Sequence, residues 1–286
     1  MGASLKLGNN IWATKEGSLL SYNDGNDKYS PLPFTVARNS NATYVGRNGL
    51  LQTALPNVPR IDFSDSADGA LLTEPQSTNL ITYSEDYLNS PWSNPGFVTP
   101  NVAISPDGSS NASLLDLSTA NSYISYPVTF NAVEQTYSLY LKSATVDGTF
   151  TINWFDGTHH RELVNLTTSW KRFDIVFTPT ATSGFVYLGD SRGLSPTLDT
   201  AYAWGAQLEE ISYATSYIKT EGTTITRIAD VVTDAGDVTT FNSSEGVLYA
   251  EIATFDDTDN SFRHISLSDG STDNVVKLVF YQNNVF

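Results

Sequence analysis

The pair His159-His160, followed by Glu162, is the one place in the sequence where neighbouring imidazoles could hold a metal ion. A zinc hydrolase needs ligands at positions i and i+4 on one face of a helix, with a base nearby. Here the pair follows an Asp156-Gly157 turn between two expected strands, and adjacent residues of a strand point to opposite faces. We therefore expect an exposed loop, with a ligand contact and a metal centre as the less favoured alternatives.

Adjacent carboxylates are the second candidate for chemistry, because a glycosidase places two acids about 5 or about 6.5–9.5 Å apart across a cleft. The adjacent acidic pairs considered are Glu85-Asp86, Glu209-Glu210 and Asp256-Asp257. No recognisable catalytic motif frames any of them. The sequence also has no G-x-S-x-G elbow, phosphate loop or dinucleotide fingerprint. We therefore expect no enzyme and name no catalytic residue.

Two acidic stretches could instead hold calcium, which takes several oxygen ligands from carboxylates and carbonyls. "DFSDSADG" offers Asp62, Asp65 and Asp68, and "FDDTDN" offers Asp256, Asp257 and Asp259. Neither stretch matches the twelve-residue EF-hand pattern with its closing glutamate. A polar turn is the favoured interpretation, and a structural calcium at Asp62, Asp65 and Asp68 stays open as the alternative. No other cofactor is suggested.

Flat aromatic side chains are the remaining chemistry, because they stack on the C–H faces of sugars while amides and carboxylates bond to the hydroxyls. In "YSLYLKS", Leu139 and Leu141 are expected to point inward, so Tyr140 points outward. Trp204 is expected in the core, because its face of "AYAWGAQLEE" also carries Tyr202, Ala206 and Leu208. The predicted glycan-binding residues are Tyr140, Asn153, His159 and Gln207.

Short strands must position these side chains. Between residues 81 and 219 we expect strands at 113–117, 123–130, 135–142, 150–155, 162–166, 171–178, 185–188 and 201–208. The alternation is clearest in "WKRFDIVFT", where Phe173, Ile175 and Phe177 share one face. Eight such strands without a convincing helix predict an all-β fold, a two-sheet jelly-roll β-sandwich.

The flanking regions divide the chain further. Residues 1–36 are expected to form an extended N-terminal arm, and residues 37–80 to connect it through short strands at 42–45, 50–53, 60–63 and 70–74. A polar linker is expected at 220–240. Residues 241–286 start a second strand series at 247–254, 264–267 and 275–281. So few strands make a poor sandwich alone, so we expect an incomplete second β-sandwich or completion by another chain.

Composition excludes several function classes. The chain has 286 residues, no cysteine and a formal net charge of −16. Such a charge disfavours nucleic acid as a partner, and the absence of thiols excludes disulfides and thiolate metal sites. The sequence shows no basic region followed by an apolar block and no run of 18 apolar residues. We therefore expect neither a signal peptide nor membrane insertion.

Four segments carry a resemblance to known proteins: "FTVARNSNATYVGRNGLLQTALPNVPRIDF", "GALLTEPQSTNLITYSEDYLNSPW", "SWKRFDIVFT" and "AWGAQLEEISYATSYIKTEGTTITRIADV". In this order they resemble the recurring segments of bacteriophage tail and head-fibre proteins, over roughly residues 34–260. In those proteins the middle portion is similar to a carbohydrate-binding-module jelly roll. The following segment often opens a sandwich of the concanavalin or laminin-G type.

The resemblance implies a structural and adhesion role in a virion. It predicts a homotrimeric fibre that contacts other virion proteins, such as capsid, portal or tail components, and that binds a bacterial surface polysaccharide. It also implies synthesis in the host cytoplasm and a location on the virion surface. Two alternatives stay open: an architectural scaffold whose receptor-binding part lies elsewhere, and a fragment of a polysaccharide depolymerase.

Overall fold

The computed structural model describes residues 12–15, 17–23, 28–31, 35–233, 263–268, 272–281 and 284–285. The chain divides into two units, residues 1–235 and residues 236–286. Within the described ranges the only helical element is the 3-10 turn η1 (Pro95–Phe97), and everything else regular is β-structure. No helix in these ranges is long and apolar enough to cross a membrane. The predicted all-β fold class is confirmed.

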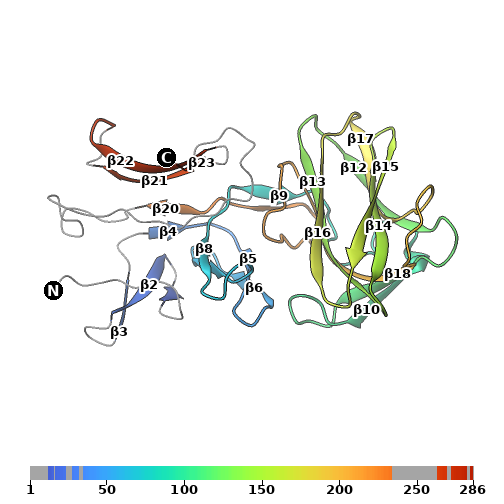
Figure 1. The fold of residues 1–286 in the computed structure, drawn as a ribbon, viewed down its shortest axis with the longest axis horizontal. Helices are drawn as coiled ribbons and strands as arrows, with labels where there is room; N and C mark the ends of the chain where they lie inside the picture. The colour runs from blue at the N-terminus through green and yellow to red at the C-terminus, as the bar shows by residue number, and fades with distance from the viewer. Residues whose placement is uncertain are drawn as a thin grey trace. The chain divides into compact units, whose positions relative to one another are not determined.

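The first unit contains a jelly-roll β-sandwich of two antiparallel sheets (Figure 1). The five-stranded sheet has the order β10 (Val98–Ala103), β11 (Ala112–Asp116), β18 (Thr200–Glu209), β13 (Gln135–Ser143), β16 (Lys171–Phe177). The four-stranded sheet has the order β12 (Tyr123–Thr129), β17 (Ser183–Gly189), β14 (Gly148–Phe155), β15 (His159–Leu166).

All eight strands predicted in this region are present, and β10 is the additional one. Its sequence, "VTPNVA", gives no clean alternation because it contains Pro100 and Asn101. Asn101 has a φ of +58°, and the pairing with β11 is irregular between Thr99 and Ala103. A proline is tolerated on an edge strand or at a bulge, where its missing N–H breaks no ladder bond. An irregular edge strand therefore lacks the periodicity by which the others were predicted.

Alternation builds the core between the two sheets. In β16, Phe173, Ile175 and Phe177 are buried in the sandwich, as predicted. They meet inward-facing side chains of the other sheet: Phe177, for example, packs edge-on against Phe130, with ring centroids 5.7 Å apart. Burial of these apolar side chains is the main stabilising contribution to the sandwich.

Trp204 is buried, as predicted, but on the opposite side of its sheet from the predicted neighbours. Ala206 and Leu208 belong to the core between the sheets. Trp204 instead packs outside the sandwich, with Leu51 and Tyr217. The prediction that Trp204 shares a face with Ala206 and Leu208 is therefore wrong.

A β-bulge at Gly205 explains the difference. Gly205 has a φ of +67°, and the register between β18 and β13 shifts between Ser138 and Tyr140. One extra residue in a strand reverses the facing of every residue that follows. A Cβ at position 205 would also lie 3.3 Å from the rings of both Tyr140 and Tyr217. Only glycine fits this backbone without strain.

Short strand pairs precede and follow the sandwich. Residues 42–72 form two antiparallel pairs, β5 (Ala42–Val45) with β6 (Leu51–Ala54) and β7 (Arg60–Asp62) with β8 (Ala70–Leu72). A tight turn at Arg47-Asn48-Gly49 joins β5 to β6, and Gly49 there has a φ of +75°.

The segment expected as a polar linker, 220–240, partly returns to this region. Residues 225–233 form β19 (Ile225–Arg227), which pairs with β9 (Ser77–Asn79), and β20 (Val231–Thr233), which pairs with β4 (Thr35–Ala37). Residues 234–240 lie outside the described ranges. Three-residue strands carry too little periodicity to be distinguished from a connector in the sequence, because their partners lie about 150 residues or more away along the chain.

The described parts of the leader form one antiparallel sheet: β1 (Trp12–Lys15), β2 (Ser18–Asn23) and β3 (Lys28–Pro31). The second unit, taken by itself, is another antiparallel sheet: β21 (Arg263–Ser268), β22 (Val275–Tyr281) and β23 (Asn284–Val285). The strand expected at 247–254 and the acidic stretch at 256–259 lie outside the described residues. A second sandwich of the concanavalin or laminin-G type stays a prediction.

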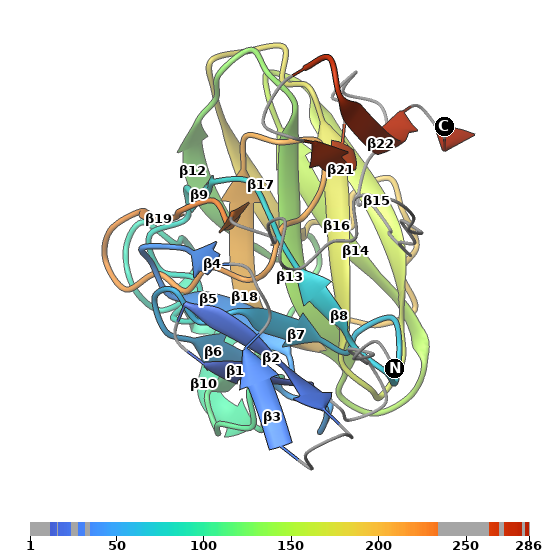
Figure 2. The same ribbon diagram turned by 90° about the vertical axis from the view of Figure 1, so that its left-hand side faces the viewer.

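The outer side of the five-stranded sheet is covered from within the first unit (Figure 2). Leu51 of β6 and Tyr217, from the segment after β18, pack onto Trp204 and Ala112 of that sheet. The Thr43 hydroxyl donates to the Tyr217 carbonyl over 2.7 Å, which ties β5 to the same segment. The part of this face around Trp204 and Ala112 is therefore committed to packing inside the chain.

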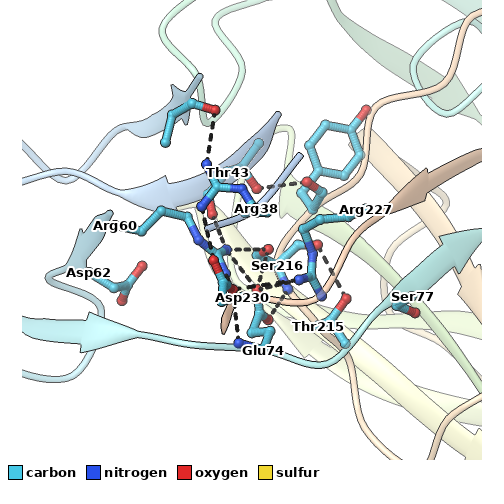
Figure 3. Close-up of polar contacts among 12 residues, drawn as sticks. Arg38, Thr43, Arg60, Asp62, Glu74, Ser77, Thr215, Ser216, Arg227 and Asp230 are labelled. Atoms are coloured by element: carbon cyan, nitrogen blue, oxygen red, sulfur yellow. Dashed lines mark hydrogen bonds and ion pairs between the residues drawn. The ribbon is translucent and has the colours of Figure 1, made fainter. Parts of the chain in front are cut away.

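A buried ion cluster fastens the cover (Figure 3). We call it the arginine cluster; its charged members are Arg38, Arg60, Arg227, Glu74 and Asp230, whose side chains are at most 2% exposed. Arg38 donates to Asp230 over 2.9 Å, Arg60 donates to Glu74 over 2.7 Å, and Arg60 also bonds to Asp230. Arg227 lies 3.6 Å from Glu74.

Each carboxylate of the arginine cluster has further partners. Both the backbone N–H and the hydroxyl of Ser216 donate to Glu74, and the Glu74 backbone N–H donates to Asp230. Burial alone would raise the pKa of Glu74, but the charges of Arg227 and Arg60 and the bonds from Ser216 outweigh it. The pKa of Glu74 therefore lies below its ordinary value, and the side chain is ionised at neutral pH.

We predict that Arg60→Met lowers the free energy of unfolding by about 3–5 kcal/mol, because it leaves buried carboxylates without their main partner. Urea unfolding followed by tryptophan fluorescence measures the change. Arg47→Met is the matched control, since Arg47 is exposed and only stacks over the Phe63 ring. It should cost no more than about 1 kcal/mol. Equal losses in the two variants would contradict the role given to the cluster.

The lowered pKa of Glu74 also predicts a pH dependence. A carboxyl group with a depressed pKa contributes stability above its ordinary value of 4.5, and that contribution disappears as the pH falls towards the folded-state pKa. The stability difference between the wild type and Glu74→Gln should therefore shrink between about pH 6 and about pH 3. Unfolding titrations of both proteins across this range measure it. A difference that stays constant would show that Glu74 does not titrate as the cluster requires.

Candidate functional site

The structure separates the four predicted glycan-binding residues onto the two sheets. Tyr140 and Gln207 belong to the five-stranded sheet. There Tyr140 packs edge-on against Trp204, with ring centroids 5.6 Å apart. Gln207 is fully buried, and its amide bonds to backbone groups of the segment after β18. These two residues therefore pack and form hydrogen bonds within the covered side of the sandwich.

Asn153 and His159 lie on the four-stranded sheet. Their side chains are on its outer face, away from the five-stranded sheet. The register places Asn153 between Arg161 of β15 and Tyr187 of β17. Phe155, two residues further along β14, lies between His159 and Phe185. The same face of one sheet thus receives side chains from three adjacent strands.

Aromatic rings form a continuous group on this face. We call it the aromatic face; its members are Tyr123, Phe155, His159, Phe185 and Tyr187. Adjacent ring centroids lie 4.6 Å apart for Phe155 and His159, 5.4 Å for Tyr123 and Tyr187, and 5.8 Å for Phe185 and Tyr187. The side chains of Phe185 and His159 are 37% and 34% exposed, whereas Tyr187 is 7% exposed and forms the floor.

Two exposed rings, Phe185 and His159, lie in one group with the half-buried rings of Phe155 and Tyr123, and this grouping on one sheet face needs an explanation. The core of the sandwich already has its own aromatic residues, and large apolar side chains gather at the surface where a ligand or partner binds. In Figure 1 the strands that carry the aromatic face, β12, β17, β14 and β15, form one layer of the sandwich.

A charged group lies beside the aromatic face. The Asp190 carboxylate, which is buried, accepts bonds from Arg161 Nη2 and Arg192 Nη2, both at 2.9 Å. The Asn153 amide donates to the carbonyl oxygens of Gly189 and Asp190 and so fixes the end of β17. The Arg192 side chain is 46% exposed, and its guanidinium lies 5.9 Å from the Tyr123 ring centroid.

Burial and these partners set the charges of the site. Burial alone would raise the pKa of Asp190, but hydrogen bonds from Arg192 and Arg161 and their charges hold it below its ordinary value. Burial and the charge of Arg161 lower the pKa of His159, against the opposing effect of Asp190. At neutral pH the site therefore presents a neutral imidazole, one carboxylate and two guanidinium groups.

The histidine pair begins β15, so it does not lie in the expected loop. His160 lies on the opposite side of the strand from His159, as alternation requires. Its ring stacks on Trp154 with centroids 4.5 Å apart, and its Nε2 lies 3.0 Å from Asp156. Asp156 also accepts a bond from the Thr180 backbone N–H. His160 therefore fastens the β14–β15 turn.

The predicted calcium residues do not form an oxygen cage. Asp62 accepts bonds from the Val45 backbone N–H over 2.7 Å and from the Ser64 backbone N–H over 2.9 Å. Such bonds stabilise a turn and use the lone pairs that a cation would need. In the described part of the chain, no group of three or more His, Cys, Asp or Glu side chains could hold a metal ion. Asp62, Asp65 and Asp68 therefore do not fit a calcium site by themselves.

The acidic pairs of the described residues have separate structural partners. Glu209 is buried and accepts bonds from Ser77 and Thr215, whereas its neighbour Glu210 bonds to Asn131. Glu85 bonds to Tyr217 and Lys219. Asp256 and Asp257 lie outside the described ranges.

Sequence reasoning missed most of the aromatic face. The string "GFVYLG" does place Phe185 and Tyr187 on one side of a strand, and "TINWF" does the same for Asn153 and Phe155. What the strings cannot show is that these strands are neighbours with the two pairs in register. The alternation within each strand therefore shows which residues of that strand share a side, but it does not show which strands lie together.

The sequence matches no protein-family profile and no curated protein. It matches several solved structures. A CBM4 structure is 13% identical over 46% of this chain and 99% of that chain, with a TM-score of 0.33. TmCBM61 in complex with β-1,4-galactotriose is 14% identical over 46% and 97%, with a TM-score of 0.34.

A third match is the enzymatically active domain of tailspike protein 4 of bacteriophage CBA120. It is 10% identical over 46% of this chain and 21% of that chain, with a TM-score of 0.28.

Proposed function

We propose that this chain is a carbohydrate-binding adhesion protein and that the aromatic face is its glycan-binding surface. The observation that carries the proposal is the group of five rings in mutual contact on the uncommitted sheet, with hydrogen-bonding side chains at its edge. Sugar rings offer C–H faces that pack on aromatic side chains and hydroxyls that bond to amides, carboxylates and guanidinium groups.

The two kinds of contact have different tasks in this proposal. Phe185 and His159, which are exposed, supply the stacking surface together with the half-buried Phe155 between them. Arg192, with nearly half of its side chain exposed, supplies donors for sugar hydroxyls. Asp190 acts as a positioning residue, since it holds both guanidinium groups in place.

We further propose that the protein is non-catalytic and belongs to a surface appendage of a bacteriophage, as a tail or head fibre. The four sequence segments that resemble phage fibre proteins support this assignment. Its partners would be other virion proteins and a bacterial surface polysaccharide. Immunogold labelling of intact particles tests the location, and release of reducing sugars from host polysaccharide would contradict the non-catalytic role.

The fibre assignment includes a homotrimer. Sedimentation equilibrium at micromolar concentration is expected to give three times the mass of the chain, which is 31.2 kDa. A stable monomer would contradict the trimer while leaving glycan binding by the aromatic face untouched.

For glycan binding, we predict that Phe155→Ala and Phe185→Ala each weaken binding at least about tenfold, because each removes a stacking ring from the centre of the surface. A glycan array of bacterial polysaccharides, followed by titration of the best binder, measures the change. Val176→Ala is the matched control, because Val176 is a 42% exposed apolar residue on the outer face of the other sheet. Its binding should equal that of the wild type.

Two outcomes would contradict the proposal. One is a folded protein that binds no bacterial glycan. The other is a glycan whose binding survives loss of both rings but not of Val176. In the first case the architectural alternative, in which the aromatic face packs against another virion protein, would be favoured.

A further inference from the structure

A pocket of about 340 Å³ adjoins the aromatic face where β17 ends. Its lining comes from the segment before β12, the start of β14 and the loop at 190–199, and it includes Ser122, Thr151, Asp190 and Asp199. Residues of the pocket and of the aromatic face are neighbours along the chain and across one strand pair. Ser122 precedes Tyr123, and Tyr123 pairs with Gly189 at the pocket's edge.

The loop that closes the pocket is fixed at both ends. The Asp190 backbone N–H donates to the Ser122 carbonyl over 3.0 Å. At the other end, the Leu198 backbone N–H donates to the Thr149 carbonyl over 3.0 Å. Phe150 and Leu198, both buried, line the pocket from the core side. The pocket is therefore a built hollow with an apolar floor rather than a gap beneath a loose loop.

Two buried hydroxyls in this pocket lack hydrogen-bond partners. They are Ser122 Oγ and Thr151 Oγ1, and Thr151 is 1% exposed. Next to Thr151 on the same face, Asn153 Oδ1 is also without a partner. Buried polar atoms are nearly always paired, and an unpaired group costs free energy of the order of 1–3 kcal/mol. The two unpaired hydroxyls of the lining, with Asn153 just outside it, point to a bound hydroxyl-bearing molecule.

The charge of the lining limits the class of that molecule. Asp190 and Asp199 line the pocket, and none of the lining residues is a lysine or an arginine. The lining therefore offers carboxylates, and the nearest guanidinium groups, those of Arg161 and Arg192, are already bonded to Asp190 rather than free for an acidic group. Its volume lies at the lower end of the range for ligand sites, which suits one small unit rather than a chain of several.

We propose that this pocket receives the terminal, uncharged sugar unit of a glycan whose next units lie on the aromatic face. This inference rests on the proposed glycan-binding function and adds to it the direction and the chemistry of recognition. The chain end, or the end of a branch, enters the pocket, because a volume of about 340 Å³ suits one unit rather than a continuing chain. Hydroxyls of the terminal unit pair with Ser122 and Thr151.

Monosaccharides test the inference directly. Saturation-transfer difference NMR on the whole protein, with glucose, galactose, mannose, rhamnose and N-acetylglucosamine each at millimolar concentration, should detect at least one binder. Glucuronic acid, which carries a charge, should not bind. Thr151→Val removes the unpaired hydroxyl with little change in shape, and it should abolish the signal or weaken binding at least about tenfold.

Thr129→Val is the matched control, because Thr129 is an exposed threonine at the end of β12. The pocket residue Ser122 precedes the opposite end of the same strand. Its binding should equal that of the wild type. If a polysaccharide binds the array but no monosaccharide gives a signal and Thr151→Val binds normally, the inference is overturned and glycan binding by the aromatic face stands. If neither polysaccharide nor monosaccharide binds, both proposals fall.

Discussion

Three buried arginines held by two buried carboxylates are the constraint on which the first unit depends. Arg38 and Asp230 are 192 residues apart in the sequence, yet their side chains are bonded inside the arginine cluster. Arg60 joins the same cluster from the short strands before the sandwich. The cluster thus bonds the strands before the sandwich to the segment that follows it. The segment around Ser216 is bonded to the same cluster.

The electrostatics explain why such a cluster holds only as a whole. Moving a charge out of water is costly, so every buried cation needs an opposite charge or several hydrogen bonds. The third cation, Arg227, has no hydrogen-bond partner for its guanidinium nitrogens, and nearby Glu209 also contributes to its electrostatic surroundings. Three cations therefore share one buried region with Glu74 and Asp230, and Glu209 adds a favourable interaction with Arg227.

Much of the sandwich could be predicted from the sequence, because its eight regular strands are long enough to show alternation. Trp204 was predicted as buried and is buried, although not on the face that it was expected to share with Ala206 and Leu208. The side was wrong because one glycine, Gly205, reverses the facing halfway along the strand. Bulges of this kind depend on the partner strand as well as on the glycine, and a single sequence does not show the partner.

The candidate site shows the same limit. Asn153 and His159 could be selected because amides and imidazoles suit sugars, and the register confirms only that they share a face. Phe185 and Tyr187 could not be added, because their place beside Asn153 depends on β17 and β14 being neighbours. The strand order of a jelly roll is not the order of the sequence, so the contacts that make the site are non-local.

The two faces of the sandwich consequently have opposite uses. The cover fastened by the arginine cluster occupies the outer side of the five-stranded sheet, so Tyr140 and Gln207 serve internal packing. The four-stranded sheet is the side on which exposed aromatic rings remain, in a chain whose net charge of −16 favours solubility despite them. A small stacking surface of this kind binds weakly as a single copy. Display in three copies on one fibre, as proposed above, would raise the avidity for a repeating polysaccharide by about 10²-fold or more without any additional contact.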